Sequence, residues 1–319
     1  MEKRPKIVVR TTISTTAKTT TRRRMCGATE VHARLCEEYP EFRVNRGKIH
    51  AETEVMVRTG RAFARVKKGP VTIPVVVHVV YRIAAENISQ AQVQSQIAAL
   101  NRDYAAANED KGDTPACWRG LVTNIGVQFK LANKDPEGKV TDGITRTKTK
   151  AASFSSHDEV KFTAKGGADA WPTDQYLNLW VCSLGEGLLG YAQFPGGPAA
   201  TDGVVILNTA FGTTGTATAP YNLGRTAVHE VGHWLNLNHI WGDTSDCSGT
   251  DHVDDTPDQQ LPNYGKPAFP HVTCQNGPNG DMFMNYMDYV DDDAMVMFTA
   301  GQSARMHATL TGPRKKIGT

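Results

Sequence analysis

The sequence predicts a mixed α/β (α+β) fold, in which a twisted mixed sheet carries the core, an irregular region follows it and a polar segment precedes it. Three observations lead to this prediction. Runs of β-branched residues alternate with stretches whose apolar residues have helical spacing. The chain contains 29 Gly and 16 Pro, which indicates many loops. Residues 1–24 are basic and rich in Thr, and such a composition cannot bury much surface.

The individual elements follow from these patterns in chain order. The run VTIPVVVHVVY, which ends at Tyr81, predicts a buried strand, and His78 within it is expected to be a core residue rather than a metal ligand. Ser89 and Thr299 are expected helix N-caps, and Gln302 completes a capping box with Thr299. The expected strands are 70–81, 125–131, 176–184, 188–194 and 203–207, and the expected helices are 30–38, 89–107, 221–237 and 299–310.

Charge is nearly balanced over the whole chain, with 35 Lys and Arg against 33 Asp and Glu and a formal net charge of +2. This balance argues against a nucleic-acid-binding domain, which would be strongly basic. No apolar run reaches the ~20 residues that a membrane-spanning helix needs. The N-terminus lacks the apolar core of a signal peptide, so the sequence itself shows no secretion signal.

Two segments depart from this charge balance. Residues 1–24 carry eight basic side chains and one acidic one, a net charge of +7. We expect a disordered, solvated leader there, and a tail that binds anionic surfaces is the less favoured alternative. Residues 241–293 carry eleven Asp and one Lys, a net charge of −10. This acidic region is either simply solvated or wraps a hard cation such as Ca²⁺, which takes several oxygen ligands.

The six cysteines include no CxxC pair, which argues against a zinc ribbon or a thioredoxin-like site. Cys247 and Cys274 flank the acidic region, where a bridge would close a long loop and imply an oxidising compartment. Cys182 lies in an apolar run and is expected to be a buried free thiol. The sequence leaves the pairing of the other cysteines open: Cys26, Cys36 and Cys117.

The stretch AVHEVGHWLNLNH at 227–239 predicts a metal site. His229 and His233 are four residues apart, so on a helix their imidazoles share one face and can bind one ion. Glu230 would lie beside that ion, where its carboxylate can polarise a water molecule. Zinc is the natural ion for imidazole ligands, and three protein ligands leave a catalytic position open. The alternative is an ordinary amphipathic helix that carries HExxH by chance.

Asn236 and His239 extend this motif to HExxHxxNxxH. A helix that ends at Asn236 needs a residue that tolerates left-handed backbone geometry, and Asn is second only to Gly in this respect. The chain can then turn and bring His239 back as a third imidazole ligand. This spacing argues against a hydrolase whose third zinc ligand is a carboxylate. It is the extended zinc signature of metzincin peptidases, with Asn in place of the usual Gly.

The chain resembles the pappalysin family of metzincins over residues 70–310. The sequence NYMDY at 285–289 is similar to the family's methionine turn, in which Met287 forms a hydrophobic floor beneath the imidazoles. The resemblance implies a metzincin-type catalytic domain, with an upper sheet subdomain that holds the active-site helix, an irregular lower subdomain and a cleft between them. Other similar segments are LNLWVCSL (177–184), LLGYAQFP (188–195), DGVVIL (202–207), HEVGHWLNLNHIWGD (229–243), VDDTP (253–257) and NYMDYVDDDAMVMFTAGQSARM (285–306).

This resemblance implies a zinc endopeptidase whose three motif histidines hold the metal. Glu230 would act as the general base and later pass the proton to the leaving amine. Tyr289 matches the family's tyrosine, which approaches the zinc or steadies the tetrahedral intermediate. The strand at 188–194 would form the antiparallel edge of the cleft and bind extended substrate by strand addition.

The resemblance also implies a substrate pocket. Asp293 falls where similar members of the family carry the acid at the base of the S1′ pocket. A buried carboxylate there would favour Arg, and less so Lys, at P1′. The alternative is that the acids at 291–293 are all solvated.

Calcium and a disulfide are implied in the acidic region. The family's calcium sites lie in the loops after the third histidine, and Cys247 and Cys274 match the family disulfide around them. Both features would order the lower subdomain. The residues that match the calcium ligands are Asp251, Val253 (through its carbonyl), Asp254 and Thr256.

The N-terminal segment gains a role from the same resemblance. The sequence RMCG, which ends at Gly27, resembles the cysteine switch of metzincin zymogens, in which the thiolate of Cys26 would occupy the open position on zinc. An ordinary leader thiol is the alternative. We therefore expect a pro-segment at 1–60 and a catalytic domain at 61–319. An enzyme that cuts before Arg could mature itself at the Gly60–Arg61 bond.

Taken as a whole, the sequence predicts a secreted zinc endopeptidase for protein or peptide substrates, with Arg or Lys at P1′, made as a latent zymogen. The alternative function is a catalytically silent, zinc-containing module that binds proteins, which the presence of Glu230 disfavours. No nucleic-acid partner and no membrane span are predicted, and the sequence does not fix an oligomeric state.

Overall fold

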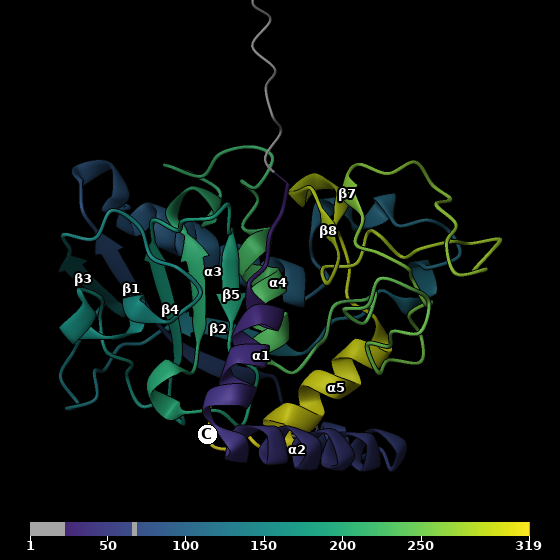
Figure 1. Cartoon of the computed structure of the whole chain (residues 1–319), viewed down its shortest axis with the longest axis horizontal. Helices are drawn as coiled ribbons and strands as arrows, with labels where there is room; N and C mark the ends of the chain where they lie inside the picture. The colour runs from purple at the N-terminus through teal and green to yellow at the C-terminus, as the bar shows by residue number, and fades with distance from the viewer. Residues whose placement is uncertain (1–22, 66–68, 319) are drawn as a thin grey trace, which may run out of the picture.

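The computed structural model describes residues 23–65 and 69–318, and this part of the chain begins with two helices (Figure 1). Helix α1 (Ala28–Glu38) confirms the helix expected at 30–38, and α2 (Pro40–Arg58) follows it after one residue. Sequence patterns did not predict α2 because only three of its residues, Phe42, Ile49 and Thr53, are buried. Of the leader predicted at 1–24, residues 1–22 lie outside the described residues.

A mixed sheet forms one half of the molecule, as predicted (Figure 1). Strand β1 is central and pairs in parallel with β2, β3 and β4, while β4 pairs in parallel with β6. Strand β5 is antiparallel to β6 and forms an edge of the sheet. The short, polar β3 was not predicted, because none of its side chains is fully buried. The strands are β1 (Val71–Tyr81), β2 (Val127–Leu131), β3 (Ile144–Lys148), β4 (Leu177–Cys182), β5 (Gly190–Ala192) and β6 (Val204–Leu207).

Three further helices complete the framework. Helix α3 (Gln90–Tyr104) begins after Ser89, whose hydroxyl accepts a hydrogen bond from the backbone of Gln92, as expected of an N-cap. Helix α5 (Ala300–Thr311) begins with the predicted capping box of Thr299 and Gln302. Helix α4 (Arg225–Trp234) is shorter at both ends than the helix expected at 221–237. It packs against β5, β6 and α3, which places the zinc motif beside the edge of the sheet.

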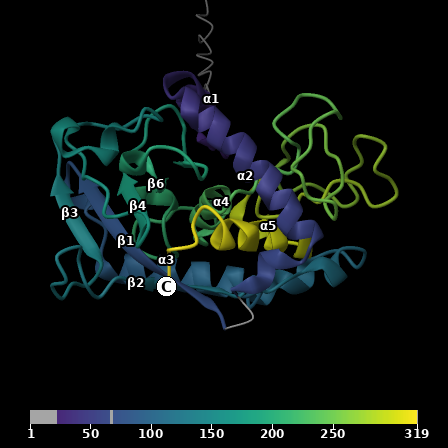
Figure 2. The ribbon, with the colours of Figure 1, turned by 90° about the horizontal axis from the view of Figure 1, so that it is seen from below.

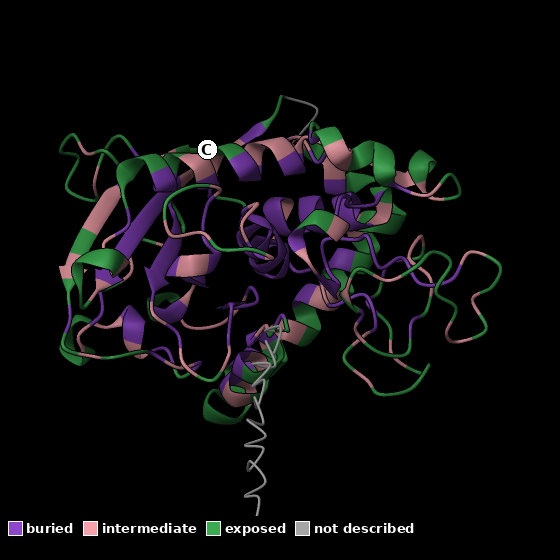
Figure 3. Cartoon of the chain, turned by 90° about the horizontal axis from the view of Figure 1, so that it is seen from above, coloured by how far each residue is buried: buried purple, intermediate pink, exposed green. Residues whose placement is uncertain are grey.

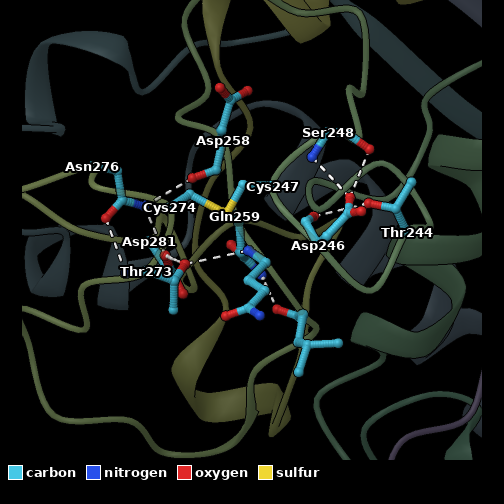
Figure 4. The surroundings of a disulfide bond; sticks show 12 residues. Thr244, Asp246, Cys247, Ser248, Asp258, Gln259, Thr273, Cys274, Asn276 and Asp281 are labelled. Atoms are coloured by element: carbon cyan, nitrogen blue, oxygen red, sulfur yellow. Dashed lines mark hydrogen bonds between the residues drawn. A yellow bond between two sulfur atoms is a disulfide. The ribbon is translucent and has the colours of Figure 1, made fainter.

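The chain between α4 and α5 is mostly irregular, as predicted for the lower subdomain, and holds the two-stranded pair β7 (Tyr264–Gly265) and β8 (Tyr289–Val290). The expected disulfide between Cys247 and Cys274 is confirmed and joins two of its loops (Figure 4). Short 3-10 helices lie in the connections: η1 (Arg61–Ala64), η3 (Ala84–Glu86), η4 (Glu109–Asp113), η5 (Arg119–Leu121), η6 (Glu159–Lys161), η7 (Thr163–Lys165), η8 (Ala199–Thr201), η9 (Asn208–Ala210) and η10 (Asp292–Ala294).

Two apolar cores lie on opposite faces of the sheet, and buried residues fill the centre of the molecule (Figure 3). The first core joins the sheet to α3, α4 and the irregular region. The second contains Trp180 and Tyr191 together with Val31, Leu35 and Phe42 of the N-terminal helices. Helices α1 and α2 are therefore built into the fold, and Figure 2 shows α2 running beside α5.

Two predictions about single buried residues are also confirmed. His78 is a core histidine, because its Nδ1 lies 2.8 Å from Thr145 Oγ1 and its Nε2 lies 2.9 Å from Asn178 Oδ1. Cys182 is a buried free thiol. Within the described residues, no helix has the length and apolar character needed to cross a membrane.

Candidate active site

Three histidine side chains converge on one point beside the edge strand. Helix α4 carries His229 and His233 one turn apart, and the loop after the helix returns His239. The Nε2 atom of His233 lies 3.1 Å from that of His229 and 3.0 Å from that of His239. All three side chains are buried. The helical spacing and the return of the chain thus bring the three predicted ligands together.

The other ring nitrogens decide what these imidazoles can bind. Nδ1 of His229 lies 2.7 Å from the Tyr286 carbonyl, and Nδ1 of His233 lies 2.8 Å from the Leu237 carbonyl. Because a carbonyl oxygen only accepts, each Nδ1 carries the proton and each Nε2 presents a lone pair. Nδ1 of His239 is held in the same way by the Asp243 carboxylate at 2.6 Å. Lone pairs that face one another repel, so the site needs a cation at its centre.

Burial favours the neutral, metal-binding form of two of the imidazoles. It lowers the pKa of His233 to about 3, and lowers that of His229 well below its usual value. Three buried imidazoles with oriented Nδ1–H groups are the donor set of a catalytic zinc centre that leaves one position open. The residues present therefore fit zinc.

Two acidic groups lie against this centre. The carboxylate of Glu230 is buried, and desolvation raises its pKa to about 8, although Arg24 and the Cys26 thiol favour the ionised form. The thiol of Cys26 donates to Glu230 Oε2 at 3.3 Å. A ligand atom of Cys26 lies within 4.8 Å of one from each of the three histidines. The N-terminal segment thus places a thiol where the fourth zinc position is expected.

The end of α4 follows the sequence prediction, and Met287 packs against this helix. Asn236 has a φ of 77°, the left-handed geometry expected where the chain turns back toward His239. The side chain of Met287 is fully buried and lies against the helix at Gly232. A Cβ atom at Gly232 would lie 2.5 Å from Met287 Sδ, so a larger residue there would displace the Met287 side chain. The sequence analysis did not identify this close approach.

The N-terminal segment lies along the edge strand of the cleft. The backbone of Gly27 donates to the Gly190 carbonyl at 2.9 Å, and that of Leu189 donates to the Met25 carbonyl at 2.9 Å. The hydroxyl of Tyr289 donates to the Cys26 carbonyl at 3.3 Å. The backbone groups of the expected substrate-binding strand are therefore taken by the chain's own residues.

A buried pocket next to the histidines holds the side chain of Arg24. Its guanidinium forms an ion pair with Asp292 at 2.6 Å, and both side chains are buried. It also donates to the Val290 carbonyl at 3.1 Å and to Thr226 Oγ1 at 3.2 Å, and it lies 5.0 Å from the centre of the Tyr221 ring. This pocket therefore provides a carboxylate, a carbonyl, a hydroxyl and an aromatic wall for a guanidinium.

The expected burial of Asp293 is wrong. Its side chain is 50% exposed and pairs with Lys266 at the surface. The neighbouring Asp292 is the buried carboxylate, because the backbone N–H of Leu223 donates to it at 2.7 Å and Arg24 covers it. In a run of three Asp, only the tertiary contacts decide which one faces the interior.

Three of the four residues predicted to bind calcium come together. Thr256 Oγ1 lies 2.8 Å from both Asp251 Oδ2 and the Val253 carbonyl oxygen. Asp251 is buried, and desolvation raises the pKa of its carboxyl to about 7. The fourth residue, Asp254, is exposed and lines a cavity next to this loop.

Comparison with known proteins agrees with this geometry. The peptidase family model described as "Pregnancy-associated plasma protein-A" matches residues 162–311. An extracellular metalloprotease of Pyricularia oryzae is 35% identical, over 88% of this chain and 86% of that protein. Extracellular metalloprotease 1 of Coccidioides posadasii is 33% identical, over 84% of each chain.

Solved structures are similar in both sequence and fold. Mature mirolysin of Tannerella forsythia, in complex with a cleaved peptide, is 52% identical, with a TM-score of 0.77, over 78% of this chain and 96% of that one. A promirolysin variant is 46% identical, with a TM-score of 0.83, over 92% of this chain and 97% of that one. With its three-histidine centre and these relatives, the chain belongs to the pappalysin family of metzincin peptidases and is a metalloendopeptidase.

Proposed function

We propose that this chain is the latent precursor of a secreted zinc endopeptidase that cuts peptide bonds before Arg, and less efficiently before Lys. One observation carries the proposal: the N-terminal segment inserts Cys26 into the three-histidine centre and Arg24 into the pocket beside it. The names of the relatives as extracellular metalloproteases support secretion.

The catalytic roles follow from what each side chain touches. Bound zinc would be held by His229, His233 and His239 and would act as a Lewis acid that polarises a carbonyl group and lowers the pKa of water. Glu230 lies at the same point, where its carboxylate can take a proton from water and return it to the leaving amine. The hydroxyl of Tyr289 donates to a carbonyl in the cleft, and in catalysis it would donate to the oxygen that gains charge.

Latency has a direct physical explanation. A substrate needs the backbone groups of the edge strand, the open metal position and the side-chain pocket. The N-terminal segment occupies all three, through its bonds to Gly190 and Leu189, the Cys26 thiol and the Arg24 side chain. The thiol would lose its proton on binding zinc, because a coordinating thiol is deprotonated by the metal.

Specificity for a basic P1′ residue follows from Asp292. When the segment leaves, this carboxylate loses its cation and the side chain that covers it, while the backbone N–H of Leu223 still holds it in position. A substrate Arg restores the pair and can reuse the Val290 carbonyl and the Thr226 hydroxyl. A Lys supplies the charge but not the planar fork of donors, so it should bind less well.

Maturation by self-cleavage fits the position of the Gly60–Arg61 bond. Thr59 and Gly60 lie between α2 and η1, and Arg61 is the first residue of η1; all three are exposed, so a second molecule can reach them. The chain just beyond is anchored to the rest of the protein, because Ala62 is buried and its carbonyl accepts from Thr311 Oγ1 at 2.9 Å. A cut before Arg61 would release residues 1–60 and leave this anchor in place.

We propose a structural calcium ion in the loop of Asp251, Val253 and Thr256, completed by Asp254. Three oxygen atoms already lie close together there, and oxygen donors are what Ca²⁺ prefers. A cation would also offset the burial of the Asp251 carboxylate.

The test is cleavage of a quenched peptide library by matured protein, with and without a zinc chelator, with the cut sites read by mass spectrometry. We expect chelator-sensitive cuts before Arg, and a mature N-terminus at Arg61. An E230A variant should keep its zinc and lose cleavage. Chelator-sensitive cuts elsewhere would reject the P1′ assignment, and an intact Gly60–Arg61 bond would reject the maturation site.

A further inference from the structure

A second group of metal-binding side chains lies away from the three-histidine centre, where α2 meets the loop at 250–255. His50 and Glu54 lie four residues apart on α2 and therefore share one face of that helix. His252 approaches them from the loop. One ligand atom of each residue lies within 4.8 Å of the other two, and His50 Nε2 is 3.0 Å from Glu54 Oε1.

The two imidazoles already face each other. The ring centres of His50 and His252 are 4.2 Å apart, with an angle of 58° between the rings. The backbone N–H of His252 donates to Thr250 Oγ1 at 3.0 Å, which holds the loop at this point. Two segments about 200 residues apart in sequence therefore present their donors to one point in space.

The donor set identifies the class of ion. Two imidazoles and one carboxylate are typical ligands of zinc and similar transition metals, whereas calcium and magnesium prefer oxygen. Zinc needs bonds of roughly 2.0–2.2 Å, so the side chains must draw together by about 1 Å. The side chain of His50 is 34% exposed and that of Glu54 is 49% exposed, so both can rotate and a dissolved ion can reach them.

The charge of the surroundings is compatible with a cation. A cavity of about 570 Å³ adjoins the three ligands. Its charged lining residues are Glu54, Asp254, Asp255, Arg58 and Arg305. The charge of Arg46 also reaches both imidazoles, so three carboxylates are balanced by three guanidinium groups before any metal binds.

We propose that His50, Glu54 and His252 form a second transition-metal site, which ties α2 to the catalytic domain. His50 and Glu54 belong to the segment that the proposed cut would release, whereas His252 remains with the mature enzyme. Metal bound here would slow release of the segment. This consequence for latency rests on the proposed function, but metal binding at the site does not.

The test uses the full chain with E230A, which prevents self-cleavage, after its catalytic position has been filled with zinc. Further Zn²⁺ is titrated by calorimetry in excess Ca²⁺ and Mg²⁺, which fill oxygen sites. We expect one further equivalent of zinc to bind. Each of H50Q, E54Q and H252Q should weaken this step by at least the ~10-fold that is typical of disturbed metal sites. The matched control is E52Q, at an exposed position of the same helix, and it should leave the step unchanged.

Three results would overturn the proposal: no further equivalent, a further equivalent that excess Ca²⁺ abolishes, or one that H252Q leaves intact. Retention of the first zinc equivalent by each variant shows that the chain is folded.

A second measurement tests whether metal bound at this site affects latency. The E230A chain is cut with a trace of active enzyme, and added zinc should slow release of residues 1–60 unless H252Q is present. If the active enzyme does not cut the E230A chain, the proposed function is rejected. The Zn²⁺ titration would still show whether the second metal site exists.

Discussion

Arg24 and Asp292 form a buried ion pair at 2.6 Å between residues 268 positions apart in the chain. One partner belongs to the N-terminal segment and the other to the loop after β8. Neither side chain reaches solvent, so each compensates the charge of the other. Under the proposed function, this pair would link latency to substrate choice, because the side chain that fills the pocket in the precursor is of the same type as the residue that the pocket would select.

The two neighbouring acids give a matched test of this assignment. D292N should lower kcat/KM for peptides with Arg at P1′ by roughly 30-fold or more, because breaking one side of a buried charge pair costs about 2–5 kcal/mol. D293N should change it by less than about twofold, since an exposed pair contributes little. The measurement is steady-state hydrolysis by mature enzyme of peptides with Arg or Leu at P1′. The reverse ranking of the two variants would reject the pocket.

Substitution of two cysteines of the N-terminal segment can distinguish latency that depends on a metal ligand from latency that depends on packing alone. C26A removes the only side chain of that segment that offers a metal-ligand atom at the three histidines, among the described residues. Its uncut precursor should hydrolyse a small peptide at least ~10-fold faster than the uncut wild type, because a metal–thiolate bond contributes several kcal/mol. C36A changes a half-buried free thiol on α1 and should stay latent. Equal latency of the two variants would exclude a cysteine switch.

The side chain of Asn236 adds a contact that glycine could not make. Its Oδ1 accepts from the Arg46 guanidinium of α2 at 2.6 Å. N236G should keep the left-handed turn and the mature activity, yet lose a charge-assisted bond worth about 1.5–3 kcal/mol. We expect the precursor to self-activate roughly tenfold faster. Time courses of precursor and mature enzyme check this, and a matching loss of mature activity would contradict it.

Packing between α4 and the methionine turn can be tested with two glycines. G232A forces Met287 to move from a buried position, at a cost of about 1–3 kcal/mol that exceeds the ~0.5–1 kcal/mol gained by Ala in a helix. Its melting temperature should fall by several degrees. Gly47 lies in α2, and a Cβ there meets nothing within 4 Å, so G47A should leave stability unchanged or raise it. Scanning calorimetry of both variants decides this, and an unchanged G232A would rule out the tight contact.

Calcium should stabilise the irregular region. At constant zinc, adding Ca²⁺ to about 100 times its dissociation constant should stabilise the wild type by ~2.7 kcal/mol, seen as a higher melting temperature. D251N should abolish this shift, and D254N should reduce it because the amide oxygen carries no negative charge. E137Q, at an exposed position in another part of the chain, is the control. If the melting temperature of the wild type does not change when Ca²⁺ is added, the proposed calcium site is wrong.

The sequence signals that predicted the site were local ones. The spacing of His229, His233 and His239 predicts a shared metal on a helix and its return loop, and the three Nε2 atoms do meet. The β-branched run of β1 and the capping residues of α3 and α5 act over a few neighbours, so those elements were also predictable.

What the sequence did not predict depends on contacts between distant residues. Helix α2 buries only three residues, so its apolar pattern is too sparse to detect. The choice of Asp292 over Asp293 is made by Arg24 and by the backbone of Leu223. The orientation of His239 by Asp243 likewise requires the folded loop.

If residues 1–60 are released as proposed, the second apolar core would be present while the chain folds and incomplete in the mature enzyme. Val31, Leu35 and Phe42 share that core with Trp180 and Tyr191 of the sheet. The precursor can use these side chains while it folds, whereas a chain that starts at Arg61 has none of them. The N-terminal helices would then serve as a folding template that is discarded afterwards. A mature enzyme that unfolds would refold less readily to its native state. The lifetime of its native state would therefore depend on the height of the barrier to unfolding.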